Sequence, residues 1–356
     1  MKSIERITIE AIELLKKLIE TPSFSSEEHQ TALLIESWFT DNAIPFERDN
    51  NNIWAYNLHF DKSKPTLLLN SHHDTVNPNQ GYTIDPFAAI VEEDKLYGLG
   101  SNDAGGCLVS LIATFTHFYK ADNMSHNIVI VASAEEESSG QNGLNSVLKF
   151  LPEIDCAIVG EPTQMQLAIA EKGLVVLDVQ VLGTASHAAH ENLDNPIMKT
   201  IGILDWFKNY KFDKISDVLG PVKATVTQIN AGKQHNVVPS ECNLVVDIRV
   251  NEKYTNQEIV DIINQNINAV IKPRSMNLKS SSIPLNHGLV QAGIALGRTT
   301  YGSPTLSDQS VLDCKSLKLG PGNSLRSHTS NEFIYLYEIE EGIEIYINIL
   351  NAFLKK

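Results

Sequence analysis

The sequence predicts an α/β fold with a largely parallel sheet flanked by helices and interrupted by a smaller α+β domain. In residues 1–172, short apolar runs rich in β-branched residues alternate with helical stretches, as in parallel sheets. In residues 173–283, longer alternating strands and two helices indicate antiparallel pairing. Residues 284–356 return to the first pattern. Because 356 residues exceed what one core usually serves, we expect 1–172 and 284–356 to form one domain around the inserted 173–283.

The first part opens with two predicted helices. Apolar residues recur at helical spacing over residues 4–19, and Thr21-Pro22 ends that helix. Ser25-x-x-Glu28 has the form of a capping box and predicts a second helix through Phe39. The elements expected next are strands at Ile53–Leu58, Thr66–Asn70, Asn127–Ala132 and Cys156–Val159, with helices at Gly106–Tyr119 and Leu144–Phe150.

The inserted segment carries fewer and longer elements. Its mostly alternating apolar pattern predicts strands that bury one face only. The expected strands are Leu174–Leu182, Val222–Ile229 and Asn243–Val250, the expected helices are Pro196–Asn209 and Asn256–Val270, and the last helix of the chain is expected at Tyr337–Phe353.

Composition excludes several classes of protein. The net charge of -15 argues against nucleic acid and anionic membranes as partners, since both bind clusters of Lys and Arg. No apolar run has the length of a membrane span, and the N-terminus lacks the apolar core of a signal peptide. The four cysteines are scattered without Cys-x-x-Cys spacing, so we expect reduced, buried thiols in a cytoplasmic protein.

The segment Ser133–Gly140 contains three consecutive carboxylates, Glu135, Glu136 and Glu137, directly after the apolar run Asn127–Ala132. Acids at the end of a buried strand repel one another and resist desolvation. No Lys or Arg lies within ten residues on either side. A bound metal cation would supply the missing positive charge; the alternative is a solvated acidic turn.

A second candidate site follows the strand that ends near Asn70. His72 and Asp74 form an H-x-D pair, and spacing i, i+2 along extended chain puts both on one face. His72 can then bind a metal while Asp74 orients its imidazole, and His73 points the other way. Because H-x-D is common by chance, a structural role for the pair is the alternative.

Three more residues have ligand chemistry. Asp103 lies in a glycine-rich segment before an apolar helix, where it would attract a cation or cap the helix. Glu161 follows another apolar strand and precedes Pro162, so a turn residue is the alternative. His328 lies in a loop before the last helix, and a surface histidine is its alternative. These candidates follow strand ends of one predicted sheet, where α/β folds place their sites.

The motifs occur in an order that resembles the M20 family of dinuclear zinc amidohydrolases. They are H-x-D at His72, G-x-G-x-x-D ending at Asp103, A-E-E-E at 134–137, G-E-P-T at 160–163, and G-P-G followed by H-x-x-x-E at 320–332. The resemblance spans essentially the whole chain and implies a zinc-peptidase-like catalytic domain.

By this resemblance, His72 and Glu161 hold one zinc, Glu137 and His328 hold the other, and Asp103 bridges the two ions. Glu136 is then the general base and Asp74 supports His72. Two Zn²⁺ ions are expected, with Co²⁺ or Mn²⁺ as substitutes. Metals that share a hydroxide acidify it and polarise the substrate carbonyl.

The resemblance also makes the insert a lid with two helices and a four-stranded antiparallel sheet that often forms a homodimer contact. His187 resembles the lid histidine that reaches the active site, sometimes that of the partner subunit, and a surface histidine is the alternative. Asn236 lies in a further lid motif. Arg249 is a candidate clamp for a substrate carboxylate, because its fork suits bidentate binding, whereas a salt bridge with Asp247 is equally expected.

We therefore expect hydrolysis of the amide bond of an N-acyl amino acid. Chain length and the Arg326-Ser327-His328 loop resemble the deacetylases of arginine biosynthesis, which implies N-acetylornithine or N-acetylcitrulline as substrate. Succinyl-diaminopimelate desuccinylase and a di- or carboxypeptidase are the alternatives, and the scarcity of Arg near the lid motifs weighs against the doubly acidic succinyl substrate. A metal-free binding domain should have lost Glu136 or a ligand, and here all are present. The chain departs from common family residues at Ser71, Leu99, Gly105 and Glu135, none of them a ligand.

Overall fold

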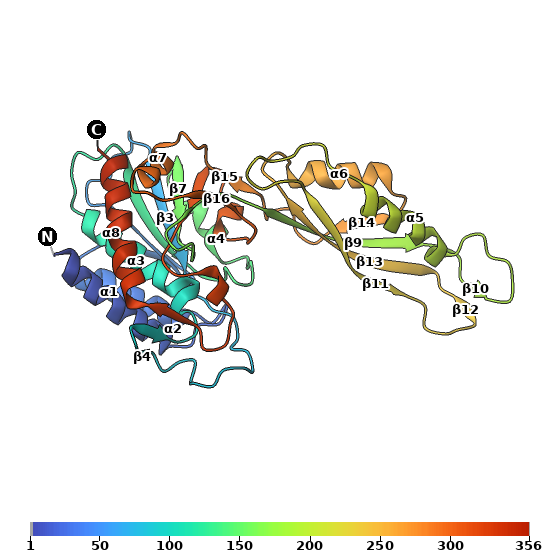
Figure 1. The fold of residues 1–356 in the computed structure, drawn as a ribbon, viewed down its shortest axis with the longest axis horizontal. Coiled ribbons are helices and arrows are strands. Elements are labelled where there is room, and N and C mark those ends of the chain that lie inside the picture. The colour runs from blue at the N-terminus through green and yellow to red at the C-terminus, as the bar shows by residue number, and fades with distance from the viewer. Residues whose placement is uncertain (1–2, 356) are drawn as a thin grey trace. The chain divides into compact units, whose positions relative to one another are not determined.

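A computed structural model describes residues 3–355 of the chain. The chain forms two compact units, both drawn in Figure 1. The first contains the chain up to Ile169, Ser282–Tyr301 and the residues from Ser307 onward, and the second contains Ala170–Ser281 and Gly302–Leu306. Among the described residues, no helix combines the length and apolarity that crossing a membrane requires.

A mixed sheet forms the centre of the first unit. Its four central strands are parallel, and antiparallel neighbours extend it on both sides. In spatial order the strands are β1 (Glu47–Asp49), β2 (Asn52–Tyr56), β6 (Asn127–Ser133), β3 (Thr66–His72), β7 (Cys156–Val159), β17 (Lys315–Lys318), β8 (Leu167–Glu171) and β15 (Ser281–Ser282), while β16 (Thr300–Ser303) also pairs with β8.

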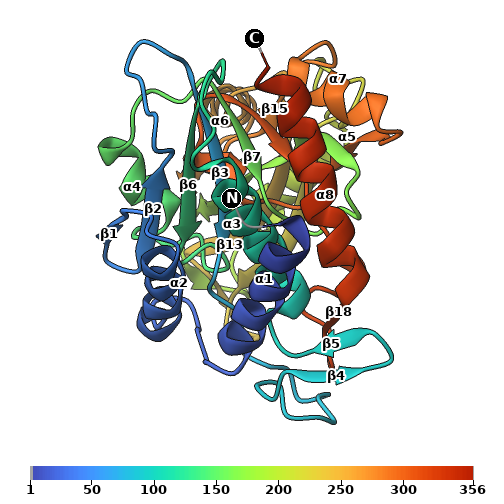
Figure 2. The ribbon, with the colours of Figure 1, turned by 90° about the vertical axis from the view of Figure 1, so that its left-hand side faces the viewer.

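Helices cover both faces of this sheet. All seven residues of β3 are buried, which explains its continuous apolar run. Leu67 and Leu69 face the larger helical layer, and Leu68 faces the smaller one. Figure 2 shows α1, α3 and α8 in front of the strands. The larger layer contains α1 (Ile4–Ile19), α2 (His29–Asp41), α3 (Gly106–Phe118), α7 (Gly288–Ala295) and α8 (Leu336–Phe353); the smaller contains α4 (Leu144–Val147).

Short elements complete the first unit. In a three-stranded antiparallel sheet, one strand lies between the loop of His328 and α8, and another strand directly precedes the glycine-rich segment. This sheet consists of β18 (Phe333–Tyr335), β5 (Lys95–Tyr97) and β4 (Ile90–Glu92), and the short helical turns are η1 (Ser101–Gly105), η2 (Leu148–Phe150), η3 (Asp308–Val311) and η4 (Ser324–Arg326).

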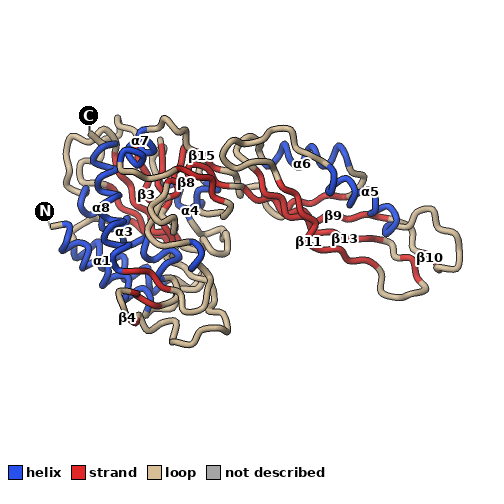
Figure 3. The backbone as a smooth tube through the Cα atoms, viewed as in Figure 1, coloured by secondary structure: helices blue, strands red, loops and turns tan. Residues whose placement is uncertain are grey.

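The second unit is a four-stranded antiparallel sheet with two helices on one face (Figure 3). Along its two inner strands, buried residues alternate with partly exposed ones, so only the helix-covered face is apolar. The strand order is β11 (Lys223–Ala231), β13 (Glu241–Val250), β9 (Gly173–Leu182), β14 (Val270–Pro273); the helices are α5 (Pro196–Asn209) and α6 (Asn256–Asn266); and β10 (Ser186–His187) pairs with β12 (Val237–Val238).

The predicted fold class is confirmed, including the largely parallel sheet and the separate antiparallel one. Two local expectations are wrong. Helix α6 ends at Asn266 because the backbone from Val270 pairs with β9 instead, so tertiary pairing overrides helical propensity. Ser25 does not cap α2; its hydroxyl donates to Asp74 Oδ2 at 2.7 Å, and Glu28 is the N-cap residue.

Candidate functional site

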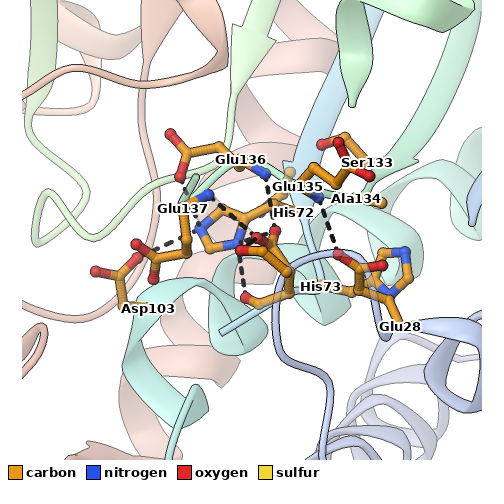
Figure 4. Close-up of polar contacts among 12 residues, drawn as sticks. Glu28, His72, His73, Asp103, Ser133, Ala134, Glu135, Glu136 and Glu137 are labelled. Atoms are coloured by element: carbon orange, nitrogen blue, oxygen red, sulfur yellow. Dashed lines mark hydrogen bonds and ion pairs between the residues drawn. The ribbon is translucent and has the colours of Figure 1, made fainter. Parts of the chain in front are cut away.

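Strands β3 and β6 bring the H-x-D motif and the acidic triplet together. The strands are parallel neighbours, and their register pairs His72 with Ser133, two residues before Glu135. The carboxyl ends of both strands therefore lie at the same edge of the sheet. Figure 4 shows His72 among the side chains of Asp103, Glu136 and Glu137.

The imidazole of His72 is buried and held on one side only. Its Nδ1 lies 3.0 Å from the carbonyl oxygen of Asp74 and 3.3 Å from Asp74 Oδ1. Its Nε2 has no hydrogen-bond partner, although carboxylate oxygens surround it. The distances from Nε2 are 3.4 Å to Asp103, 3.7 Å to Glu161 and 3.9 Å to Glu136. An unpartnered ring nitrogen facing carboxylates fits a metal ligand.

The ionisation of this cluster reflects the crowding of acids away from water. Burial lowers the pKa of His72, but Asp103 and Asp74 outweigh it and hold that pKa well above its usual value. Burial raises the pKa of Glu136 well above its usual range. Burial, together with the charge of Asp103, raises the pKa of Glu161 to about 8. The acids thus retain protons unless a cation replaces them.

His328 and Glu137 form the other half of the cluster. His328 Nε2 lies 3.0 Å from Glu137 Oε2 and 3.6 Å from Asp103 Oδ2. The hydrogen bond with Glu137 raises the pKa of His328 to about 9. Asp103 is therefore near both histidines, with Oδ1 toward His72 and Oδ2 toward His328.

Asp74 has a second role beside its contact with His72. Its carboxylate accepts the backbone N–H groups of Glu136 and Glu137, both at 3.1 Å. It also accepts the hydroxyl of Ser25. Asp74 is buried, yet its pKa is lowered, because the neighbouring His72 and the hydroxyl of Ser25 outweigh the cost of burial. One carboxylate thus fixes both the imidazole and the acidic turn.

Glu135 does not belong to the metal-facing set. Its carboxylate accepts the hydroxyl of Ser26 at 3.0 Å and the backbone N–H of Asn142 at 3.0 Å. Its own backbone N–H donates to Glu28 Oε1 at 3.1 Å. With a φ of 53°, Glu135 lies in the left-handed region, and its side chain ties the turn to the start of α2. Its function is to hold the loop.

Glu332 holds the backbone of Asp103 and of the residue before it. Its Oε1 accepts the backbone N–H of Asn102 at 2.9 Å and that of Asp103 at 2.8 Å. The side chain is almost fully buried, and burial raises its pKa to about 8. The sequence placed Glu332 in the last motif but indicated no role for it. A carboxylate that accepts backbone N–H groups can have neighbours of any residue type, so no sequence pattern reveals it.

Two further charged residues were missed. Asp308 accepts the hydroxyl of Ser133 at 2.6 Å, and burial raises its pKa to about 6. Lys318 is buried on β17 and lowers the pKa of Glu161 against the larger effect of burial. Asp308 lies more than 150 positions from Ser133, and Lys318 lies more than 150 positions from Glu161. No local pattern of residues could therefore have revealed either one.

The three predicted substrate-binding residues belong to the second unit. His187 and Asn236 lie side by side on the β10–β12 ribbon, where the N–H of Ala188 donates to the carbonyl of Asn236. Arg249 forms the salt bridge that was its alternative: its Nε and Nη2 donate to Asp247 at 2.9 Å and 3.1 Å.

In each of two overlapping sets of residues, the ligand-type atoms lie within 4.8 Å of one another. One set is His72, Asp103 and Glu137, and the other is His72, Glu136 and Glu161. Imidazole and carboxylate groups suit Zn²⁺ and related divalent metals, and the unpartnered Nε2 of His72 points at both sets. The residues therefore fit a metal centre.

Residues 68–352 match the model of peptidase family M20/M25/M40. The chain belongs to the M20 peptidase family. This membership makes it a hydrolase of amide bonds, and the matched residues include His72, the acidic triplet, Glu161 and His328.

This M20 chain is similar in sequence to proteins named succinyl-diaminopimelate desuccinylase. It is 27% identical to succinyl-diaminopimelate desuccinylase of Blochmanniella pennsylvanica, over 95% of this chain and 97% of that protein. It is 28% identical to the protein of that name from Buchnera aphidicola, over 73% and 74% of the two chains. It is 24% identical to succinyl-diaminopimelate desuccinylase 2 of a Ruegeria species, over 73% and 70%.

These relatives show that the expected deacetylation of N-acetylornithine or N-acetylcitrulline is wrong, since they bear the name that was the alternative. The expectation rested partly on the loop at Arg326. In the structure, Arg326 donates to Glu338 at 2.6 Å and 2.8 Å, so its guanidinium supports the loop. The loop therefore carried no information about the substrate.

Two solved structures of hydrolases that act on peptides share the fold. The aminopeptidase PepT of Bacillus cereus superposes with a TM-score of 0.75 at 17% identity, over 98% of both chains. The M20 family metallo-carboxypeptidase of Sulfolobus solfataricus superposes with a TM-score of 0.74 at 16% identity, over 97% of this chain and 99% of that one.

Proposed function

We propose that this M20 chain hydrolyses the amide bond of succinyl-diaminopimelate in a metal-dependent reaction. The observation that carries the proposal is the buried, unpartnered Nε2 of His72 among carboxylates, in a chain whose relatives are named succinyl-diaminopimelate desuccinylases. The cluster supports metal-dependent hydrolysis, and the relatives support the substrate.

Two Zn²⁺ ions are the proposed cofactors. His72 and Glu161 would hold one ion, Glu137 and His328 the other, and Asp103 would contact both. The opposite directions of the two Asp103 oxygens, toward His72 and toward His328, support this assignment. Zinc bound there would polarise the amide carbonyl and lower the pKa of water.

Glu136 is the proposed general base. It lies 3.9 Å from His72 Nε2, nearly as close as Glu161 at 3.7 Å, so distance alone does not distinguish a base from a ligand. Its backbone is fixed by Asp74, and its side chain is enclosed, which gives the carboxylate a raised affinity for protons. Glu136 would take the proton of the attacking water and deliver it to the leaving amine.

A group of cations in the second unit supports an acidic substrate. Lys223 lies opposite Arg249 in the β11–β13 register. Burial lowers the pKa of Lys172, and the charges of Lys223 and Arg249 lower it further, so the three cations are close to one another. Arg249 would bind a substrate carboxylate after exchanging its bond with Asp247. His187 and Asn236 lie beyond Leu182, at the opposite end of the sheet from Arg249, so they would contact that substrate only from a second copy of the chain.

We also propose a homodimer formed through the second unit. Helix α5 exposes the apolar side chains of Ile197, Met198 and Ile201, and β11 is an edge strand on which Ile229 is exposed. Apolar side chains next to an unpaired strand edge suit a second copy of the chain. Light scattering behind size exclusion tests this: Ile201→Glu should give the monomer mass, whereas a wild-type chain that is already monomeric would overturn it.

The substrate proposal is tested with a panel of N-succinyl, N-acetyl and dipeptide substrates, each assayed with zinc-loaded protein of measured metal content. We expect kcat/KM for succinyl-diaminopimelate to exceed that for its N-acetyl counterpart by at least about tenfold, because one lost charge-assisted contact costs about 1.4 kcal/mol or more. Faster cleavage of a dipeptide would favour a peptidase. Cleavage of none, at full metal content, would contradict the function itself.

A further inference from the structure

A second group of metal-ligating side chains lies at the other end of the central strands. His126 immediately precedes β6, Cys156 is the first residue of β7, and Asp155 precedes it. β6 and β7 flank β3, so these residues meet beside its first residue, Thr66, whereas His72 is its last. Six residues of extended chain place this group about 20 Å from the catalytic cluster.

The geometry of this group suits one small cation. The ligand atoms of His126, Asp155 and Cys156 all lie within 4.8 Å of one another. His126 Nε2 is 3.7 Å from Asp155 Oδ2. Zn–N bonds of about 2.0 Å and Zn–S bonds of about 2.3 Å put tetrahedral ligand atoms roughly 3.3–3.7 Å apart. Small rotations of these side chains would therefore complete a zinc site.

The hydrogen bonds of His126 leave the correct ring nitrogen for a metal. Ser125 Oγ lies 2.8 Å from His126 Nδ1 and donates its proton to the carbonyl of Phe353 at 3.5 Å. When Nδ1 carries the ring proton, it donates to this hydroxyl, and Nε2 keeps a lone pair. That lone pair faces the carboxylate of Asp155. In this tautomer, a cation between Nε2 and the carboxylate would relieve the repulsion of two acceptors.

The charges of the three groups match a divalent ion. Cys156 is fully buried, and binding would release its thiol proton. A carboxylate and a thiolate then neutralise one Zn²⁺. Asp155 is half exposed, so the ion can enter from solvent.

We propose that His126, Asp155 and Cys156 form a zinc site distinct from the catalytic cluster, with a fourth position open to water. Nitrogen, oxygen and sulfur ligands together favour Zn²⁺ over the hard cations Mg²⁺ and Ca²⁺. The ion joins the starts of β6 and β7 across β3, and it therefore stabilises the sheet. It also adds one zinc equivalent beyond those that the catalytic cluster holds.

Cobalt titration of metal-free protein separates the two sites, because the catalytic cluster offers nitrogen and oxygen ligands, whereas this site offers a thiolate. We expect a near-ultraviolet thiolate-to-cobalt absorption band in the wild type and its loss in Cys156→Ser. Cys314→Ser, and Cys107→Ser beside the catalytic cluster, are the matched controls and should keep the band. A wild type without the band, or a band that persists in Cys156→Ser, would overturn the proposal.

A second variant guards against misfolding of the buried Cys156→Ser change. Asp155→Asn alters a half-exposed side chain and should fold, while removing one ligand charge. We expect it to bind one zinc equivalent fewer than the wild type, with at least about tenfold weaker cobalt binding in the thiolate band. Its turnover should match that of the wild type. Unchanged zinc content and cobalt affinity in Asp155→Asn would contradict the site, whatever the fate of the catalytic proposal.

Discussion

Asp74 Oδ1 accepts the backbone N–H of Glu136 at 3.1 Å. The same oxygen lies 3.3 Å from His72 Nδ1, and the other oxygen accepts the N–H of Glu137 at 3.1 Å. The acidic turn and the histidine therefore share one support, although they come from different strands. A shift of Asp74 would displace the proposed metal ligand His72 and the proposed base together.

Asp74→Asn tests this shared support. The amide keeps one acceptor, but its NH₂ group would face a backbone N–H of the turn, so either His72 or the turn loses its partner. We expect metal affinity or kcat to fall by about 10- to 100-fold, with small change in KM. Metal analysis and steady-state kinetics measure both. Normal metal content with normal kcat would show that the support is dispensable.

Glu136→Gln tests the proposed base, with Glu135→Gln as a matched control from the same triplet. Loss of the proton acceptor should lower kcat by about 10²- to 10⁴-fold while the metal stays bound. Glu135 instead binds Ser26 and Asn142. Its amide variant should therefore lower Tm and leave kcat near the wild-type value. Unchanged turnover in Glu136→Gln would refute the assignment, and loss of metal would identify Glu136 as a ligand.

Much of the fold could be predicted because the central strands are buried on both faces and therefore appear as continuous apolar runs. The run at Thr66–Asn70 marks β3, and the two-residue extension to His72 follows from pairing with Ser133, which sequence alone does not reveal. Val270, the first residue of β14, was assigned to the preceding helix, because it becomes part of a strand only by pairing with the edge of β9.

The candidate site could be predicted only in part. His72, Glu136 and Glu161 follow strand ends, and parallel strands bring such ends together. The residues that support them come from distant segments: Glu332 binds a backbone N–H 230 positions away. The cations near Arg249 were also missed, because Lys223 reaches it only through the β11–β13 register. Their absence from the local sequence had weighed against the acidic substrate that is proposed here.

Glu332→Ala removes the support of the Asp103 loop. The N–H groups of Asn102 and Asp103 would be buried without an acceptor, at a cost of about 1–3 kcal/mol in the free energy of unfolding. We expect a lower Tm and weaker metal binding through a displaced Asp103. Glu332→Gln keeps an oxygen acceptor and should retain most of both. If the alanine and glutamine variants bind metal equally well, Glu332 does not position Asp103.

The pKa values of the cluster predict that metal-free protein loses stability as pH rises. Glu161 and Glu332 have folded pKa values of about 8 against an ordinary 4.5, and His328 has one of about 9 against 6.5. Each group binds protons more tightly in the folded chain, so its contribution is complete below the ordinary pKa and disappears as pH rises through the folded one. The three effects have the same sign.

Thermal unfolding between about pH 5.5 and pH 8.5 measures this, with EDTA and with excess Zn²⁺. Tm with EDTA should fall from about pH 6.5 upward, whereas below that pH His73, whose pKa burial lowers to about 4, acts in the opposite direction. Zn²⁺ replaces the retained protons, so the increase in Tm that it causes should be larger at the alkaline end. Because self-repulsion of the net charge of -15 acts in the same direction, Glu332→Gln serves as the control: it removes one titrating group and should reduce the slope. A metal-free Tm that rises with pH at the alkaline end, or a slope that Glu332→Gln leaves unchanged, would contradict the buried-acid explanation and leave the general charge as the cause.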